Sequence, residues 1–182
     1  LMETVNALER EARNKLEAIQ ELKEKRIENY FKQAYKDIGL LAQSEDAMMG
    51  SRILIEYHNE MGIKGDEPFT IDRDKYNPIW QKIDPVLGNY VRTLGYYDVF
   101  IICAKHGHVM YSHSRESDLG ANLKYGELKD EGLAELWSEV VRTREVAIQD
   151  FSAYTPSGGK QAAFLGAPIM NTSGEMIAVA AL

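Results

Sequence analysis

Apolar and small side chains recur three or four positions apart through the first 45 residues, from Val5 to Leu41. This spacing places them on one face of an α-helix, and the intervening charges of both signs are typical of a solvated face. Such a helix would be roughly 65 Å long, whereas a globule of this chain length has a radius of gyration of about 16 Å. The helix must therefore protrude, and its apolar face needs a partner. A helix folded back on its own domain is the alternative, but we favour a dimerising stalk over residues 1–25 and packing against the domain over residues 26–45.

Further helical segments follow this first helix. The pattern predicts a second helix over residues 46–61 and two short helices that begin at Asn77 and at Asp84. Each of these two residues precedes a proline, and a polar N-cap followed by proline at the first helical position is a typical helix start. We assign these segments to a globular domain of residues 46–182, which follows a stalk helix of residues 1–45.

From residue 98 onward the hydrophobic period changes from that of a helix to that of a strand. Apolar runs predict five strands, over residues 99–103, 109–113, 146–151, 161–169 and 175–182. A glycine turn joins the first two strands, and Asp130 is predicted to cap an amphipathic helix before the third. Because the first and last strands are the most apolar, we expect them to be the central pair, with the second and third strands on the two edges. The predicted fold class is α+β: a long N-terminal helix followed by a PAS-like five-stranded antiparallel sheet covered by helices.

Charge and composition argue against a nucleic-acid partner and against a membrane-spanning helix. The 182 residues carry 21 Lys and Arg against 28 Asp and Glu, a net charge of −7. An acidic chain repels phosphate backbones, so nucleic acid is not an expected partner. The longest wholly apolar run, Met176 to Leu182, is far shorter than the roughly 20 residues of a membrane-spanning helix. This strand-like run stops without a terminator, and we expect the sequence to be a piece of a longer protein.

Motifs for catalysis and cofactor binding find little support. The sequence has neither a Gly-x-Ser-x-Gly elbow nor a His-Glu-x-x-His zinc motif, and Gly158-Gly159-Lys160 lacks the glycine spacing of a phosphate-binding loop. Cys103, His106, His108 and His113 suggest a metal or haem site, but their spacing matches no structural zinc site. We therefore predict no enzymatic activity, no metal and no cofactor.

A few polar residues at separate places in the sequence could contact a ligand. Strand alternation places His113 on the same face as Tyr111 and Val109, where an imidazole and a phenol would point inward together. Asp150 ends the third strand beside Tyr154, and it either caps a turn or places a negative charge at the mouth of a pocket. The candidate cations for a carboxylate ligand are Arg92, Arg115 and Lys124.

Five segments resemble the Cache (PAS-like) sensor module, the ligand-sensing domain of bacterial methyl-accepting chemotaxis receptors and some sensor kinases. They are Tyr97–Ile102, Asp118–Leu123, Asp150–Gly158, Gln161–Pro168 and Ala178–Leu182. The resemblance covers about residues 30–182 and is most specific in the C-terminal half. The long N-terminal helix also fits, since such domains hang between two membrane helices and dimerise through that helix.

The resemblance implies a periplasmic domain of an inner-membrane protein, tethered to the membrane, that binds a small molecule between sheet and helices. The loop after the second strand lacks the Arg-x-Trp-Tyr signature of amino-acid-binding double Cache receptors. The implied ligand is therefore an organic acid or another small polar metabolite. Asp150 and Tyr154 lie in a motif that matches the Cache module. The other positions of the implied ligand shell are inferred from which face of a strand each residue occupies. The ligand shell is expected at Tyr111, His113, Lys124, Tyr125, Trp137, Asp150, Tyr154, Phe164 and Gly166.

We expect the chain to be the ligand-binding sensor domain of a transmembrane chemoreceptor, and to form a homodimer through its N-terminal helix. One alternative is a dimerisation and signal-transmission module that binds no ligand. Another is the sensor domain of a histidine kinase.

Overall fold

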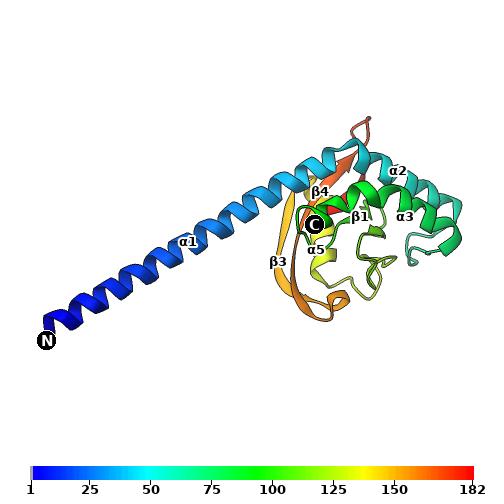
Figure 1. Cartoon of the computed structure of the whole chain (residues 1–182). Coiled ribbons are helices and arrows are strands. Elements are labelled where there is room, and N and C mark those ends of the chain that lie inside the picture. Colours follow the sequence, from blue (N-terminus) through cyan, green and yellow to red (C-terminus); the bar gives the residue numbers. More distant parts are fainter. Residues whose placement is uncertain (1) are drawn as a thin grey trace. The chain divides into compact units, whose positions relative to one another are not determined.

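The structure, a computed structural model, describes residues 2–182, with side chains from residue 6 onward. The chain forms two compact units, one up to Lys36 and one from Asp37 to Leu182. Helix α1 (Met2–Gln43) makes up the first unit and continues into the second, which confirms the predicted long helix (Figure 1). Among the described side chains of the first unit, seven large hydrophobic ones are between 49% and 67% exposed, and they include Leu8, Leu16, Ile19 and Leu22.

Two further helices open the second unit, and one of them corrects a prediction. Helix α2 (Glu45–Glu60) is capped by Ser44, whose hydroxyl accepts the Ala47 amide. Helix α3 (Arg73–Leu87) is a single helix, where two short ones were predicted. Its N-cap is Asp72, whose carboxylate accepts two amides of the first turn, so neither Asn77 nor Asp84 begins a helix. The two prolines lie inside α3, and the Asp84 side chain is left available for tertiary contacts. The short helix α4 (Asn89–Arg92) follows.

Five antiparallel strands form one sheet. They are β1 (Phe100–Cys103), β2 (Val109–Ser112), β3 (Ala147–Tyr154), β4 (Lys160–Met170) and β5 (Met176–Ala181). Their order is β2-β1-β5-β4-β3, with β1 and β5 paired in the interior and β2 and β3 on the edges. The predicted fold class, central pair and edge strands are therefore confirmed.

Helices cover both faces of this sheet. Helix α5 (Gly132–Thr143) packs on one face, where its Leu136 and Val140 join Phe100, Ile102 and Val179 in a buried apolar cluster. The alternate positions of the same strands point to the opposite face, which α2 and α3 cover, and most of them are also buried. The predicted cap of α5 at Asp130 is wrong. The N-cap position is Glu131, whose carboxylate accepts hydrogen bonds from Thr155 instead of capping the helix.

A β-bulge between β1 and β2 corrects another prediction. Ile101 is paired with Tyr111, but Ile102 is paired with Val109, so Met110 is an extra residue on the β2 side. An extra residue reverses the alternation of side chains. Val109 therefore lies in the α5-side cluster, whereas Tyr111 points to the α3 side. His113 shares a face with Tyr111 but not with Val109.

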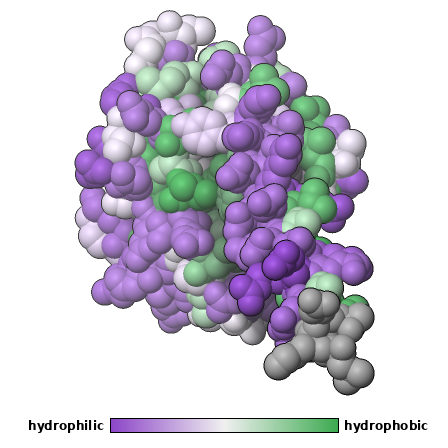
Figure 2. Space-filling view, turned by 90° about the vertical axis from the view of Figure 1, so that its left-hand side faces the viewer, coloured by the Kyte–Doolittle hydropathy of each residue, from purple (hydrophilic) through white to green (hydrophobic). Residues whose placement is uncertain are grey.

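The surface of the protein is mainly polar on the face that Figure 2 shows, with apolar side chains gathered in small separate patches. Among the described residues, no helix combines the length and the apolar character that crossing a bilayer requires.

Candidate functional site

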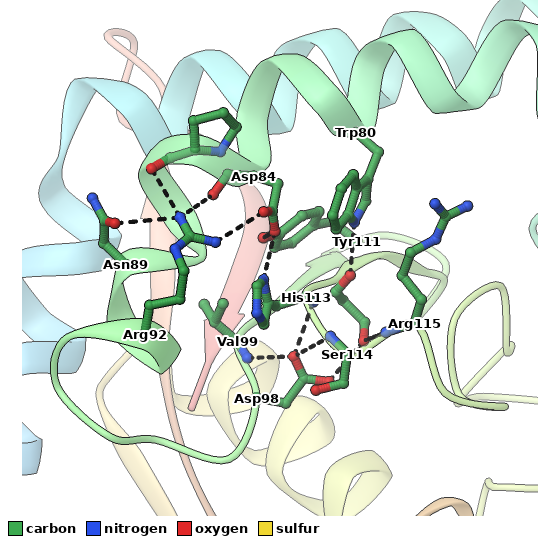
Figure 3. A network of polar contacts seen from close by, with 12 residues as sticks. Trp80, Asp84, Asn89, Arg92, Asp98, Val99, Tyr111, His113, Ser114 and Arg115 are labelled. Carbon is green, nitrogen blue, oxygen red and sulfur yellow. Dashed lines mark hydrogen bonds and ion pairs between the residues drawn. The ribbon is translucent and has the colours of Figure 1, made fainter.

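The Asp84 carboxylate links three elements of the fold on the α3 side of the sheet (Figure 3). One of its oxygens accepts the Tyr111 hydroxyl at 2.8 Å and Nδ1–H of His113 at 2.6 Å. The other accepts the Arg92 guanidinium at 3.0 Å. Asp84 comes from α3, Tyr111 and His113 from β2 and its end, and Arg92 from α4. Two residues of the predicted ligand shell and one predicted cation thus meet at an aspartate that the sequence analysis assigned to a helix cap.

Arg92 is held by more than its ion pair. Its second terminal nitrogen donates to the main-chain carbonyls of Asp84 and Pro85 and to the side-chain oxygen of Asn89. The backbone of Gly88 passes so close that an added Cβ would lie 2.4 Å from Arg92 Nη1 and 2.6 Å from His113 Nδ1. Only glycine leaves room for the guanidinium and the imidazole together at this place.

The electrostatics of Asp84 follow from these donors. Burial alone would raise the pKa of Asp84, but the hydrogen bonds from His113, Tyr111 and Arg92 hold its pKa below the ordinary value. Burial and the Asp84 charge raise the pKa of Tyr111. The carboxylate is therefore ionised and the phenol neutral at physiological pH. Both oxygens of the carboxylate are occupied by hydrogen bonds from within the network.

A second buried carboxylate, Asp98, fixes the end of β2. It accepts the amides of Val99, His113 and Ser114 and the hydroxyl of Ser112, at 2.7–3.1 Å. Burial raises the pKa of Asp98, and these hydrogen bonds oppose that effect. Asp98 thereby sets the backbone from which the His113 side chain reaches Asp84.

A cationic and aromatic surface lies beside this network. The Trp80 indole stacks on the His113 ring with centroids 6.4 Å apart, and its N–H donates to the Ser112 carbonyl at 3.0 Å. The Arg115 guanidinium lies 5.1 Å from the Trp80 ring centroid and donates to Asn77 at 2.7 Å. Arg115 has a φ of 53°, a left-handed conformation that non-glycine residues rarely adopt. A partly exposed guanidinium on an aromatic ring can bind a carboxylate.

Lys124, Tyr125 and Trp137 line two surface hollows on another part of the same unit. Lys124 and Tyr125 border a hollow of about 240 Å³ together with His106. Lys124 and Trp137 border a second hollow, of about 410 Å³. The Lys124 ammonium lies 5.1 Å from the Tyr125 ring centroid, whereas the Trp137 indole is nearly buried and donates to the Cys103 carbonyl at 3.0 Å.

Tyr154, Phe164 and Gly166 belong to the packed interior between α5 and the sheet. The Tyr154 and Phe164 rings meet edge to face with centroids 4.9 Å apart. The Tyr154 hydroxyl donates to Asp118 at 2.9 Å, and burial raises the pKa of Asp118 to about 6. A Cβ at Gly166 would lie 2.9 Å from a Leu136 methyl carbon, so α5 sits directly on β4 here. A ligand would reach these three residues only if α5 moved.

Asp150 is exposed, and its carboxylate accepts the amide of the next residue, Phe151, at 2.7 Å. Asp150 and Tyr154, which were predicted as a pair, are neighbours in sequence but share no hydrogen bond, because the Tyr154 hydroxyl donates to Asp118. The predicted shell is thus distributed over the Asp84 network, the two hollows, the α5-side interior and the exposed β3 edge.

Sequence reasoning missed four buried polar residues that organise the unit: Asp84, Asp98, Asp118 and Asn122. The Asn122 amide nitrogen donates to the carbonyls of Gly65 and Glu67, both at 3.0 Å, and its oxygen accepts the amides of Lys124 and Tyr125, also at 3.0 Å. Three of the four lie in segments that resemble the Cache module. Their place in these segments was the one sign in the sequence that they matter for the fold.

The strand order after a long N-terminal helix defines a PAS-like α+β fold. Among solved structures, the sensor domain of the V. cholerae histidine kinase DctB is similar to this chain, with a TM-score of 0.52 and 12% sequence identity. The match covers 85% of this chain and 48% of the other, so this chain spans about half the length of that domain. No protein-family model matches the chain, and no curated protein is similar to it in sequence. The likeness shows the fold.

Proposed function

We propose that this chain is the extracytoplasmic sensor domain of a transmembrane chemoreceptor and that its compact unit binds a small polar metabolite. The observation that carries the proposal is the β2-β1-β5-β4-β3 sheet after a 42-residue helix, an architecture shared with a solved sensor domain. The buried groups Asp98, Asp118 and Tyr154 lie in the segments that resemble the Cache module, which further supports it. A histidine kinase is the second candidate for the full-length protein, because the similar solved domain comes from one.

The proposed ligand is an organic acid or a related polar metabolite, recognised by cations next to aromatic rings. Two places offer this combination: Arg115 against Trp80 beside His113, and Lys124 against Tyr125. Both are accessible without any movement of α5. The proposal for the remaining shell residues, Tyr154, Phe164 and Gly166, requires α5 to separate from β4.

A thermal-shift screen of the whole chain against several hundred small metabolites tests ligand binding. A ligand present at 100 times its Kd should stabilise the fold by about 2.7 kcal/mol, a rise in Tm of several degrees for this size. Lys124→Ala and Arg115→Ala should each weaken a carboxylate ligand only if it binds at that cation. Asp150→Asn should weaken an amine or hydroxyl ligand by roughly 1.5–3 kcal/mol if the carboxylate binds it.

The exposed Glu60→Gln variant serves as the control and should leave the ligand shift unchanged. If no compound raises Tm, the ligand-binding proposal fails and the dimerisation module becomes the better account. Asp150 lies inside β3 and does not end the third strand as predicted, so it caps no turn. If Asp150→Asn alters Tm but not affinity, its carboxylate serves only to accept the Phe151 amide.

Dimerisation through α1 is the second part of the proposal. The exposed apolar side chains Leu8, Leu16, Ile19 and Leu22 need a cover, and a second copy of the same helix supplies one. We expect sedimentation equilibrium to show a dimer at high micromolar concentration and Leu16→Asn with Ile19→Asn to give a monomer. The exposed Glu17→Gln variant should remain a dimer. A wild-type chain that stays monomeric under these conditions contradicts the proposal.

A further inference from the structure

Three histidines from two segments meet on the α2 side of the β1–β2 turn. His58 lies on α2, and His106 and His108 flank the turn glycine between β1 and β2. One ring nitrogen from each lies within 4.8 Å of the others, and the three pairs of ring centroids are 5.1–5.5 Å apart. His58 and His108 are buried, whereas His106 is partly exposed. The metal interpretation considered from the sequence omitted His58 and included Cys103 and His113, which are not part of this group.

Two of these imidazoles present buried nitrogens without a hydrogen-bond partner. Nε2 of His108 lies 2.8 Å from the Glu67 carbonyl, which can only accept, so Nε2 carries the proton and Nδ1 holds a lone pair. That Nδ1 has no partner, and neither has Nε2 of His58. The other ring nitrogen of His58 faces the side-chain oxygen of Asn59 at 3.3 Å. Burying an unpaired polar atom is costly, and a metal ion would satisfy both lone pairs at once.

The arrangement around the rings is that of metal-ligating histidines. Such residues commonly donate the second ring N–H to a carbonyl or carboxylate, which fixes the tautomer and the ring orientation. The Glu67 carbonyl does this for His108 and is itself held by the Asn122 amide. Gly65 has no side chain there, and a Cβ would lie 2.8 Å from Cδ2 of His106 and 3.3 Å from its Nε2. The glycine lets the His106 ring lie against the loop.

The site is accessible to solvent, and burial favours the neutral form of its imidazoles. His106 borders the hollow of about 240 Å³, which leads from solvent to the ring. Burial, followed by the charges of its neighbours, lowers the pKa of His106, and burial likewise lowers the pKa of His108. Neutral imidazoles are the form that binds metal ions. Lys105 and Lys124 beside the hollow oppose a cation and Asp66 only partly offsets them, so the affinity should be moderate.

We propose that His58, His106 and His108 bind one divalent transition-metal ion of the Zn²⁺ type. Three imidazoles suit Zn²⁺, Ni²⁺ and Cu²⁺, and three histidines leave a fourth position open to water or to an exogenous ligand from the hollow. Zn–N distances of about 2.0–2.1 Å require the three nitrogens to draw closer than they lie here. We expect the His106 ring, which is partly exposed, to supply this movement by rotating. The binding does not depend on the proposed sensor function.

Isothermal titration calorimetry of the metal-stripped whole chain with Zn²⁺ alone tests the proposal. We expect one ion per chain with a Kd in the micromolar range and a rise in Tm on saturation. His106→Ala removes a ligand that is partly exposed, so the fold should persist and the affinity should fall at least about tenfold, the lower end of the effect of perturbing a metal site. His58→Gln, which keeps a polar side chain of similar volume, should also weaken binding. Glu60→Gln, an exposed carboxylate on the same helix, should bind like the wild type.

Replacing Zn²⁺ by Co²⁺ gives a second readout that does not rely on stability. Strong visible absorption from four-coordinate Co²⁺ is expected for the wild-type chain and should disappear in His106→Ala. The proposal is overturned if the wild-type chain does not bind Zn²⁺ in the micromolar range. It is also overturned if a folded His106→Ala variant, verified by circular dichroism, binds Zn²⁺ and Co²⁺ as the wild type does.

Discussion

Replacing Asp84 with alanine should lower the free energy of unfolding by about 3–5 kcal/mol, the range for removing one partner of a buried charged network. The variant leaves the Tyr111 hydroxyl buried without its acceptor and removes the acceptor of the His113 imidazole. The Arg92 ion pair contributes less, because the arginine side chain is 42% exposed. Urea denaturation of wild type and variant measures the difference.

Two variants make this result specific. Gln81→Ala changes an exposed position on the same helix and should shift the unfolding free energy by only a few tenths of a kcal/mol. Tyr111→Phe removes a single hydrogen bond and should cost about 1–2 kcal/mol. If Asp84→Ala were no more destabilising than Tyr111→Phe, the network would not hold α3 to β2, and Asp84 would be a candidate for ligand contact instead.

Stability should also depend on the protonation of Asp118. Burial raises the pKa of Asp118 to about 6, so between its unfolded and folded pKa values the folded state binds more protons than the unfolded state. A group with a raised pKa contributes its stabilisation in acid and loses it as pH rises through the folded pKa. From pH 4 to pH 7 the wild-type chain should therefore lose roughly 2–3 kcal/mol relative to Asp118→Asn, which cannot titrate.

Unfolding free energies of both chains across this pH range give the test. The comparison of the two chains isolates Asp118 from Asp84, whose lowered pKa acts with the opposite sign. Asp130→Asn, at an exposed position, should follow the wild-type curve. A constant difference between wild type and Asp118→Asn would mean that the pKa of Asp118 is the same in the folded and unfolded chains.

The fold follows from local patterns along the chain, and for that reason it was predictable. The period of apolar residues gives α1 and the strands, and the greater apolarity of β1 and β5 places them together inside the sheet. The bulge at Met110 has no such signal, because one extra residue in a buried strand leaves the apolar run unchanged. The single helix α3 was also missed, because Asp72 caps it ahead of two prolines that resemble helix starts.

The site residues depend on contacts between segments that are distant in sequence. Asp84 joins Tyr111 and His113 only because α3 crosses the edge strand β2. His58 joins the other two histidines only because α2 covers the turn that carries them. Its position four residues after Leu54, on the buried face of α2, was the one available sign. Composition and spacing record none of these tertiary contacts.

We expect the Asn122 side chain to couple the opening of two loops that are distant in sequence. Its four hydrogen bonds link the Gly65–Glu67 loop to the amides of Lys124 and Tyr125, and neither loop is part of a helix or strand. Local opening events expose backbone amides to exchange with solvent hydrogen. The amides of Lys124 and Tyr125 should exchange when Asn122 releases them, and if Asn122 releases both loops together, their exchange rates should follow the opening of the Gly65–Glu67 loop as well.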